Sequence, residues 1–286
     1  MMPNIEVNFK NKKVTTNSWG MRDRSYDLHA PADSRRIAIL GASAVFGSGV
    51  ADEEVFEALL EEMLNNDQSS KDRVGFEILN FAKYARVALQ QALVLETKIV
   101  RFKPDTMMLF VHHNEARRGL ETLARIVKNK IDVPYPYIQS VIDRADVDSE
   151  MSKFEIEKRL LPYEDELLAD TYQTIAKICR DHEIVPVWVY MPLTYESLTD
   201  ADIGERMAAA EAAEFVVFSL RDVYHEYEPE ELNVALWDDH PNAFAHKLIA
   251  DRIYGHIKRT VQGTSTASFS FMKKSEVVVQ NKPNSR

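Results

Sequence analysis

The sequence contains one cysteine, Cys179, among its 286 residues. A single thiol cannot form a disulfide within the chain, so the fold must depend on its core, and the cysteine content neither requires nor excludes an oxidising compartment. Cys179 lies in the segment TYQTIAKICRDHEI, whose pattern is typical of an amphipathic helix. We therefore interpret Cys179 as a buried structural thiol rather than a nucleophile.

Long apolar runs and an excess of basic residues are also missing. No segment approaches the roughly 18 apolar residues of a membrane-spanning helix, and the first residues, MMPNIEVNFKNKK, lack the apolar stretch of a signal peptide. The 45 acidic residues outnumber the 35 basic ones, which argues against nucleic acid as the main partner. We expect a soluble chain, cytoplasmic as given; export as part of a longer protein and the oligomeric state stay open.

Glycine is scarce, yet three of the nine glycines fall within IAILGASAVFGSGV, residues 37–50. Small residues at the end of a buried strand permit a tight turn that lifts the hydroxyl of Ser43 out of the sheet edge. The segment has neither the lysine and spacing of a phosphate-binding loop nor the G-x-G-x-x-G pattern of a dinucleotide-binding loop. Ser43 is therefore either a nucleophile or the cap of the following helix.

The hydrophobic pattern predicts the fold class. Five short apolar runs alternate with amphipathic helical patterns, which indicates parallel βαβ units. We predict an α/β fold, a three-layer α/β/α sandwich of flavodoxin-like type with a central, mostly parallel five-stranded sheet. The predicted strands are residues 35–40, 76–82, 106–111, 184–192 and 214–220. The predicted helices are 52–66, 88–102, 164–182, 201–214 and 240–261.

Three regions follow from this pattern. Residues 1–33 are polar with little periodicity and are expected to form an extended arm. Residues 34–261 form the main domain, which carries a charged, irregular insertion at about 117–165. Residues 262–286 form a polar, serine-rich tail.

Polar side chains gather where the predicted strands end, the edge at which such sheets bind ligands. Ser43 follows the first strand, Asn114 follows the third, and WDDHPN precedes the last helix, which His240 is expected to begin. A serine nucleophile needs a general base and a carboxylate that orients the base. His240 can be that base, and Asp238 or Asp239 can orient it. At this point both aspartates stay open, although Asp239 is adjacent to His240 and less able to fold back onto its ring.

Four ordered blocks resemble the SGNH (GDSL-like) hydrolase superfamily over about residues 17–258. GASAVFGSGV resembles the family's G-D-S-x-x-x-G-x-G block, and ILNFAKYA resembles its N-x-G block. PDTMMLFVHHNEA and WDDHPNAFAHKLIADRIY resemble the third and the last block. TNSWGMRD, which includes Arg22, is similar to a segment that precedes the serine block in one branch of the family. We interpret Arg22 itself as a structural tie between the arm and the core.

The resemblance implies the SGNH hydrolase fold and a serine-dependent esterase without a cofactor. It assigns Ser43 as the nucleophile and His240 as the general base. Many members place the orienting carboxylate three residues before the histidine, where this chain has Trp237, and others place it two residues before, which selects Asp238. We therefore favour Asp238. Its oxyanion hole would consist of the backbone N–H groups of Ser43 and Ala82 and the side-chain amide of Asn114. The expected substrate is a small-molecule or glycan ester, such as an O-acetyl group of a carbohydrate or natural product, and the same site also suits an acyltransferase.

The chain departs from the family pattern at Ala42, Ala82, His112 and Glu115, where members have aspartate, glycine, glycine and aspartate. These departures keep open a weakly active or inactive binding module with the same fold. His112, His113, Glu115 and Trp237 are candidates for the wall of the pocket. Adjacent side chains in an extended segment point in opposite directions, so His112 and His113 are not expected to share a metal ion, and no metal site is predicted.

Overall fold

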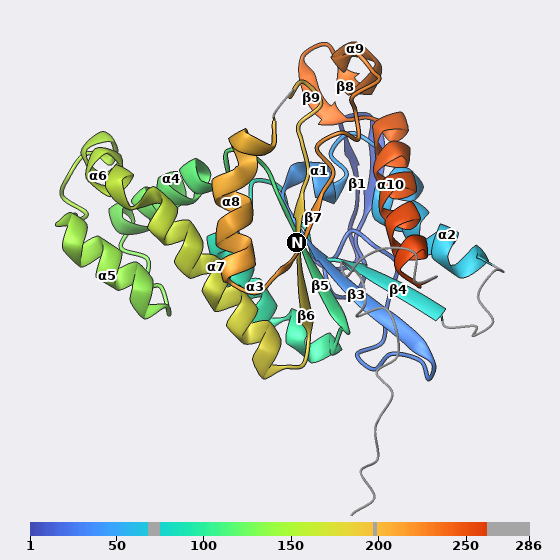
Figure 1. The fold of residues 1–286 in the computed structure, drawn as a ribbon, viewed down its shortest axis with the longest axis horizontal. Coiled ribbons are helices and arrows are strands. Elements are labelled where there is room, and N and C mark those ends of the chain that lie inside the picture. Colours follow the sequence, from blue (N-terminus) through green and yellow to red (C-terminus); the bar gives the residue numbers. More distant parts are fainter. Residues whose placement is uncertain (68–74, 197–198, 262–286) are drawn as a thin grey trace, which may run out of the picture.

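A parallel five-stranded sheet forms the centre of the computed structural model, which describes residues 1–67, 75–196 and 199–261 (Figure 1). The strand order is β4-β3-β5-β6-β7, and each neighbouring pair is parallel. The strands are β3 (Ser34–Leu40), β4 (Gly75–Asn80), β5 (Thr106–Val111), β6 (Val185–Tyr190) and β7 (Val216–Ser219). All five predicted strands are present, and the predicted three-layer α/β/α fold is confirmed.

Two layers of helices cover the sheet, because alternate residues of its buried strands face opposite sides. In β3, Ile37 and Ile39 belong to one apolar cluster, whereas Ala38 and Leu40 belong to the other. Figure 1 shows α2 and α10 on one side of the sheet and α3, α7 and α8 on the other. The helices are α2 (Phe56–Asn66), α3 (Ala88–Thr97), α7 (Glu164–Asp181), α8 (Asp200–Ala212) and α10 (Ala243–Val261).

The region predicted as an irregular insertion is helical. It contains α4 (Glu115–Lys128), α5 (Pro136–Ala145), α6 (Lys153–Leu160) and the 3₁₀ turn η3 (Leu161–Tyr163), and α5 and α6 project from one end of the molecule (Figure 1). Its charges lie on solvated helix faces, while Leu120, Ile138 and Ile156 are buried in the same core cluster as the sheet. The prediction missed these helices because their polar faces dominate the composition.

The N-terminal region is not simply extended. It forms an antiparallel hairpin of β1 (Glu6–Phe9) and β2 (Lys12–Thr15). Two residues connect these strands, Lys10 and Asn11, and both have positive φ, as a type I′ turn requires. The polar tail at residues 262–286 lies outside the described residues. None of the described helices combines the length and apolar content needed to cross a membrane.

The remaining short elements connect the sheet to the helices. The predicted helix at 52–66 is divided into η1 followed by α2, and the predicted helix at 88–102 is divided into α3 followed by η2. A second small antiparallel pair lies just before α10. These elements are α1 (Ser43–Phe46), η1 (Asp52–Glu54), η2 (Ile99–Phe102), α9 (Pro229–Leu232), β8 (Asn233–Ala235) and β9 (Asp238–Pro241).

Candidate active site

Ser43 occupies the turn between strand β3 and the short helix α1. It is the first residue of α1, Ala42 is the N-cap, and no side chain caps this helix. The Ser43 hydroxyl is therefore not used as a cap. Its Oγ lies 2.8 Å from Nε2 of His240, a residue 197 positions later in the chain. The structure thus brings the first and the last sequence block together.

Arg22 of the N-terminal region holds the loop that follows Ser43. Its guanidinium donates hydrogen bonds to the carbonyl oxygens of Phe46, Gly47 and Val50 and forms an ion pair with Asp52 at 2.7 Å. Arg22 is only 2% exposed, so its charge is compensated entirely by these fixed acceptors. The predicted structural role of Arg22 is confirmed: it ties the arm to the loop that positions Ser43.

The glycines of this loop adopt conformations that other residues rarely take. Gly47 has φ +82° and Gly49 has φ +95°, in the left-handed region where a Cβ atom is unfavourable. A Cβ on Gly49 would lie 2.6 Å from Cγ2 of Val234 in β8. The glycines therefore allow the loop to turn sharply and to lie against the segment that precedes His240.

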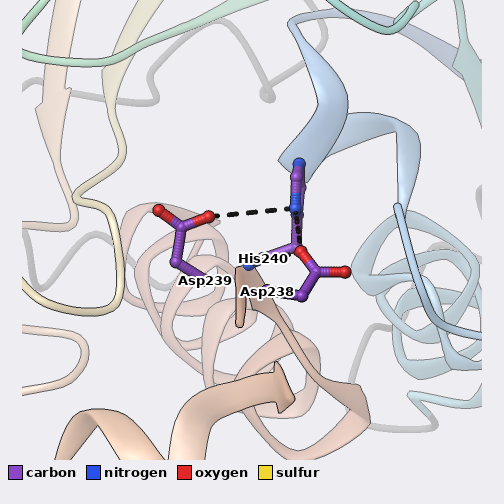
Figure 2. A group of neighbouring side chains, drawn as sticks. All are labelled: Asp238, Asp239 and His240. Carbon is purple, nitrogen blue, oxygen red and sulfur yellow. Dashed lines mark hydrogen bonds and ion pairs between the residues drawn. The ribbon is translucent and has the colours of Figure 1, made fainter. Parts of the chain in front are cut away.

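His240 lies in the short strand β9, not at the start of α10 as the sequence predicted. Alternate residues of a strand share one face, so Asp238 and His240 share a face of β9, and Figure 2 shows the Asp238 and Asp239 carboxylates on different sides of the His240 ring. Nδ1 of His240 is 2.5 Å from Oδ1 of Asp238 but 4.0 Å from Oδ1 of Asp239. The Asp239 side chain is also 56% exposed, against 12% for Asp238. The geometry supports Asp238 as the orienting carboxylate.

These contacts fix the protonation pattern of the imidazole. An ionised carboxylate can only accept hydrogen bonds, so Nδ1 of His240 must carry the proton that it shares with Asp238. Nε2 then has its lone pair directed at Ser43 Oγ and can accept the hydroxyl proton. This arrangement places an imidazole nitrogen where it can accept a proton from the Ser43 hydroxyl.

Lys10, which sequence reasoning did not select, also reaches this group. Its Nζ lies 2.6 Å from Oδ2 of Asp238 and 3.3 Å from Nδ1 of His240. Burial alone would raise the pKa of Asp238, but hydrogen bonds from Lys10 and His240 outweigh burial and leave this pKa below its ordinary value. The hairpin turn therefore places a cation against the carboxylate and helps to keep it ionised.

Asp238, Asp239 and His240 also form a group whose ligand atoms lie within 4.8 Å of one another, close enough to be tested as a metal site. The Lys10 ammonium, however, contacts both Asp238 and Nδ1 of His240. A divalent cation bound by those atoms would face a fixed positive charge at hydrogen-bond distance. The residues present therefore do not fit a metal ion, and we assign none to them.

The three predicted oxyanion donors have different surroundings. The N–H of Ser43 lies at the N-terminus of α1, where a helix offers no internal acceptor. Asn114 precedes α4, and its Oδ1 atom is buried with no hydrogen-bond partner in the described part of the chain. The N–H of Ala82, in contrast, donates to Oδ1 of Asn80 at 3.0 Å. In this structure the Ala82 N–H is therefore engaged rather than free, which departs from its predicted role.

The two adjacent histidines are held by the scaffold. His112 is buried and donates from Nδ1 to the carbonyl oxygen of Met191 at 2.9 Å. Burial lowers the pKa of His112 to about 4, so it is neutral near pH 7. His113, which is partly exposed, pairs with the buried Glu196. The two side chains thus have separate partners.

The other two candidates for the pocket wall differ strongly in exposure. Glu115 is buried at the start of α4, and its carboxylate accepts the backbone N–H of Ala88 at the start of α3 rather than pairing with His112. Burial raises the pKa of Glu115 to about 7. Trp237 is 89% exposed, so it belongs to the surface beside the site.

Tyr84 is a second neighbour of the site that sequence reasoning missed. Its ring stacks on His240 with centroids 5.9 Å apart, and Phe9 packs edge-on against Tyr84. Tyr84 lies in the second sequence block, whose position after β4 could have indicated it. Lys10 had no such signal, because nothing in a polar hairpin turn indicates which distant loop it contacts.

Comparisons with known proteins agree with this architecture. No family model matches the sequence, and no curated protein matches it. The structure is similar to a catalytic mutant of an acetylxylan esterase from Geobacillus stearothermophilus, with a TM-score of 0.50 and 12% identity over 78% of this chain and 94% of that one. It is also similar to a two-domain esterase active on acetylated mannans, with a TM-score of 0.52 and 14% identity over 81% of this chain and 51% of that one. At these identities the likeness shows the fold alone: this chain has the three-layer α/β/α fold, with a central parallel sheet, of these two esterases.

Proposed function

We propose that the protein is a serine-dependent esterase that cleaves a small acyl ester through an acyl-enzyme intermediate. The observation that carries the proposal is the continuous hydrogen-bonded series from Ser43 Oγ to His240 and from His240 to Asp238, at 2.8 and 2.5 Å. Distances of this kind are those that proton transfer between a nucleophile, a base and an orienting carboxylate requires.

In the proposed reaction, Ser43 Oγ attacks the acyl carbonyl while Nε2 of His240 takes the hydroxyl proton. Asp238 holds the Nδ1–H tautomer and stabilises the imidazolium that forms. The imidazolium then donates its proton to the departing alkoxide, which leaves as an alcohol. A water molecule attacks the acyl-serine while it gives a proton to Nε2 of His240. When the second tetrahedral intermediate collapses, the bond from the acyl carbon to Ser43 Oγ breaks, the imidazolium returns the proton to Ser43 Oγ, and the carboxylic acid leaves.

The tetrahedral intermediates need hydrogen-bond donors directed at their oxyanion. We assign this role to the Ser43 N–H, at the N-terminus of α1, and to the Nδ2–H group of Asn114, which precedes α4. Ala82 becomes the third donor if substrate binding draws its N–H away from Asn80 Oδ1, which now accepts it at 3.0 Å. The alanines at 42 and 82 remove none of these groups.

The names of the similar structures support an acetyl ester of a carbohydrate or natural product as the substrate class. One is an acetylxylan esterase and the other is active on acetylated mannans. An acyl-enzyme would also serve an acyltransferase, but no feature of the described residues favours an alcohol over water as the acceptor. The complete hydrogen-bonded series favours turnover over a module that only binds.

Labelling with a fluorophosphonate probe tests the nucleophile. The parent protein should become labelled at Ser43, and Ser43→Ala should not be labelled. A series of p-nitrophenyl esters of increasing chain length, run with the same variant as control, should show turnover that depends on Ser43 and is fastest for the acetate. A parent protein that neither reacts with the probe nor hydrolyses any ester would instead be a binding module.

A further inference from the structure

A cavity of about 210 Å³ lies between the N-terminal region, the loop that follows β4, and the end of α3. Residues from all three segments and from η2 form its wall. They include Ser18, Trp19 and Met21 of the N-terminal region, and Phe81, Ala82 and Phe102 beyond β4 and in η2. With about 30 Å³ for each molecule of liquid water, the cavity has room for an acidic group together with part of its carrier.

Four cationic side chains line this cavity, and no carboxylate does. They are Lys83, Arg86, Lys98 and Arg101, in a chain whose formal charge is −10. Within the described residues, none of the four has an ion-pair partner; Arg86 donates instead to the carbonyl oxygen of Phe81 at 2.9 Å.

The contrast with other arginines of the N-terminal half is clear. Arg24 pairs with Glu61, Arg35 with Asp105 and Arg36 with Glu77, at 2.6 to 2.9 Å. Unneutralised positive charge is therefore a property of this cavity and not of the N-terminal half as a whole.

The four cations line the same cavity, and Arg86 is partly buried in its wall, where burial lowers its pKa. Like charges held close together without counter-charges repel one another, and an anion placed between them would relieve that repulsion.

The cavity adjoins the proposed catalytic group. The backbone N–H of Lys83 donates to the carbonyl oxygen of Gly41 at 3.2 Å, two residues before Ser43. Tyr84, the next residue, stacks on the His240 ring. A substrate with its acyl group at Ser43 can therefore extend past this loop towards the cations.

We infer that this cavity binds an anionic group (a carboxylate, sulfate or phosphate) on the part of the ester substrate that does not react. The inference rests on the proposed esterase function and names its substrate class: an acyl ester of an acidic carrier. Binding energy from such a remote group raises kcat/KM without any new group at the reacting carbonyl. The cations also attract an acidic substrate to a molecule whose overall charge would repel it.

A matched pair of substrates tests the inference: monoacetylated methyl glucoside, which is neutral, and monoacetylated methyl glucuronide, which carries a carboxylate. Charge-assisted hydrogen bonds predict that kcat/KM is about tenfold or more higher for the glucuronide. In Lys98→Gln/Arg101→Gln, whose two positions are exposed, the ratio of the two kcat/KM values should fall towards one. The control Lys158→Gln removes an exposed charge from α6 and should leave the ratio unchanged.

Competition separates the possible anions. Sodium glucuronate, sodium sulfate and inorganic phosphate are each tested as inhibitors of the parent enzyme, and the one that inhibits at the lowest concentration identifies the preferred group. Inhibition should weaken in the double variant. Equal kcat/KM for the two acetates, with no inhibition by any of the three anions, would overturn the inference while leaving the esterase proposal intact.

Failure of the esterase proposal is detected separately, as absence of fluorophosphonate labelling and of turnover for every ester. Calorimetric titration of the parent protein with the same three anions then tests the cavity directly. Binding that disappears in the double variant but persists in Lys158→Gln supports the anion site. Absence of binding, or equal binding by the double variant, rejects it.

Discussion

Replacing Lys10 by methionine tests whether the N-terminal hairpin tunes the proposed catalytic pair. Methionine keeps much of the apolar length of lysine and removes the ammonium. That ammonium lies 2.6 Å from Asp238 Oδ2 and 3.3 Å from His240 Nδ1. It stabilises the ionised carboxylate, and it repels the imidazolium that His240 forms when it takes a proton. Both effects disfavour the protonated form of the pair.

The magnitude follows from the distance. Two unit charges 3.3 Å apart interact by about 1 kcal/mol even at the dielectric constant of water. Lys10 is 27% exposed and Asp238 12% exposed, so we keep this solvent-screened value instead of that of a protein interior. An energy of about 1 kcal/mol corresponds to about one pH unit. Because removal of the ammonium relieves this repulsion of the imidazolium, the acidic limb of the pH–rate profile should move to higher pH by about that amount.

The assay is the pH dependence of kcat/KM for p-nitrophenyl acetate. Lys10→Arg retains the charge and should keep the acidic limb near its original position. Lys12→Met is the matched control, because Lys12 belongs to the same hairpin but pairs with Glu54 at 2.9 Å. An acidic limb that stays in place or moves to lower pH in Lys10→Met would refute the reasoning. A loss of activity at all pH values, shared by Lys12→Met, would show that the hairpin acts only through folding.

Two further substitutions test the assignment of neighbouring carboxyl groups. Asp238→Asn should lower kcat/KM by about a thousandfold or more, because the amide cannot stabilise the correct imidazole tautomer. Asp239→Asn, at an exposed position, should keep kcat/KM within about threefold of the parent. A larger loss of kcat/KM in Asp239→Asn than in Asp238→Asn would exchange the roles of the two carboxylates. Glu115→Gln keeps an oxygen that can accept the Ala88 N–H and removes a carboxyl whose pKa burial raises to about 7. Since the folded state holds this carboxyl protonated, the free energy of unfolding of the parent should fall as pH rises from the ordinary carboxyl pKa towards 7. Urea unfolding should therefore show Glu115→Gln gaining up to about 3 kcal/mol of stability relative to the parent over that pH interval. Parallel profiles of unfolding free energy against pH would contradict this.

The order of strands and helices could be predicted from the sequence because both leave local signals. Short apolar runs alternate with amphipathic patterns, and all five predicted strands occur in the structure. The polar edge of the sheet followed from one rule, that parallel strands present their carboxyl ends together. That rule placed Ser43 near His240, and in the structure Ser43 Oγ lies 2.8 Å from His240 Nε2.

Local patterns also produced the errors. The residues around His240 were expected to begin a helix, but they form a strand paired with β8. Pairing with β8, a separate segment, makes these residues a strand, and in a strand Asp238 and His240 share one face. Likewise, nothing in the second block indicates that the Asn80 side chain accepts the Ala82 N–H.

The sequence by itself determined the layered fold, the position of Ser43 at a strand end and the supply of a base and a carboxylate. Only the tertiary structure decided that Lys10 contacts Asp238 and His240, and that four cations without carboxylate partners surround one cavity. The reason is that periodicity records which face of an element is buried, whereas a contact such as that between Lys10 and His240, 230 residues apart, depends on the packing of the complete chain.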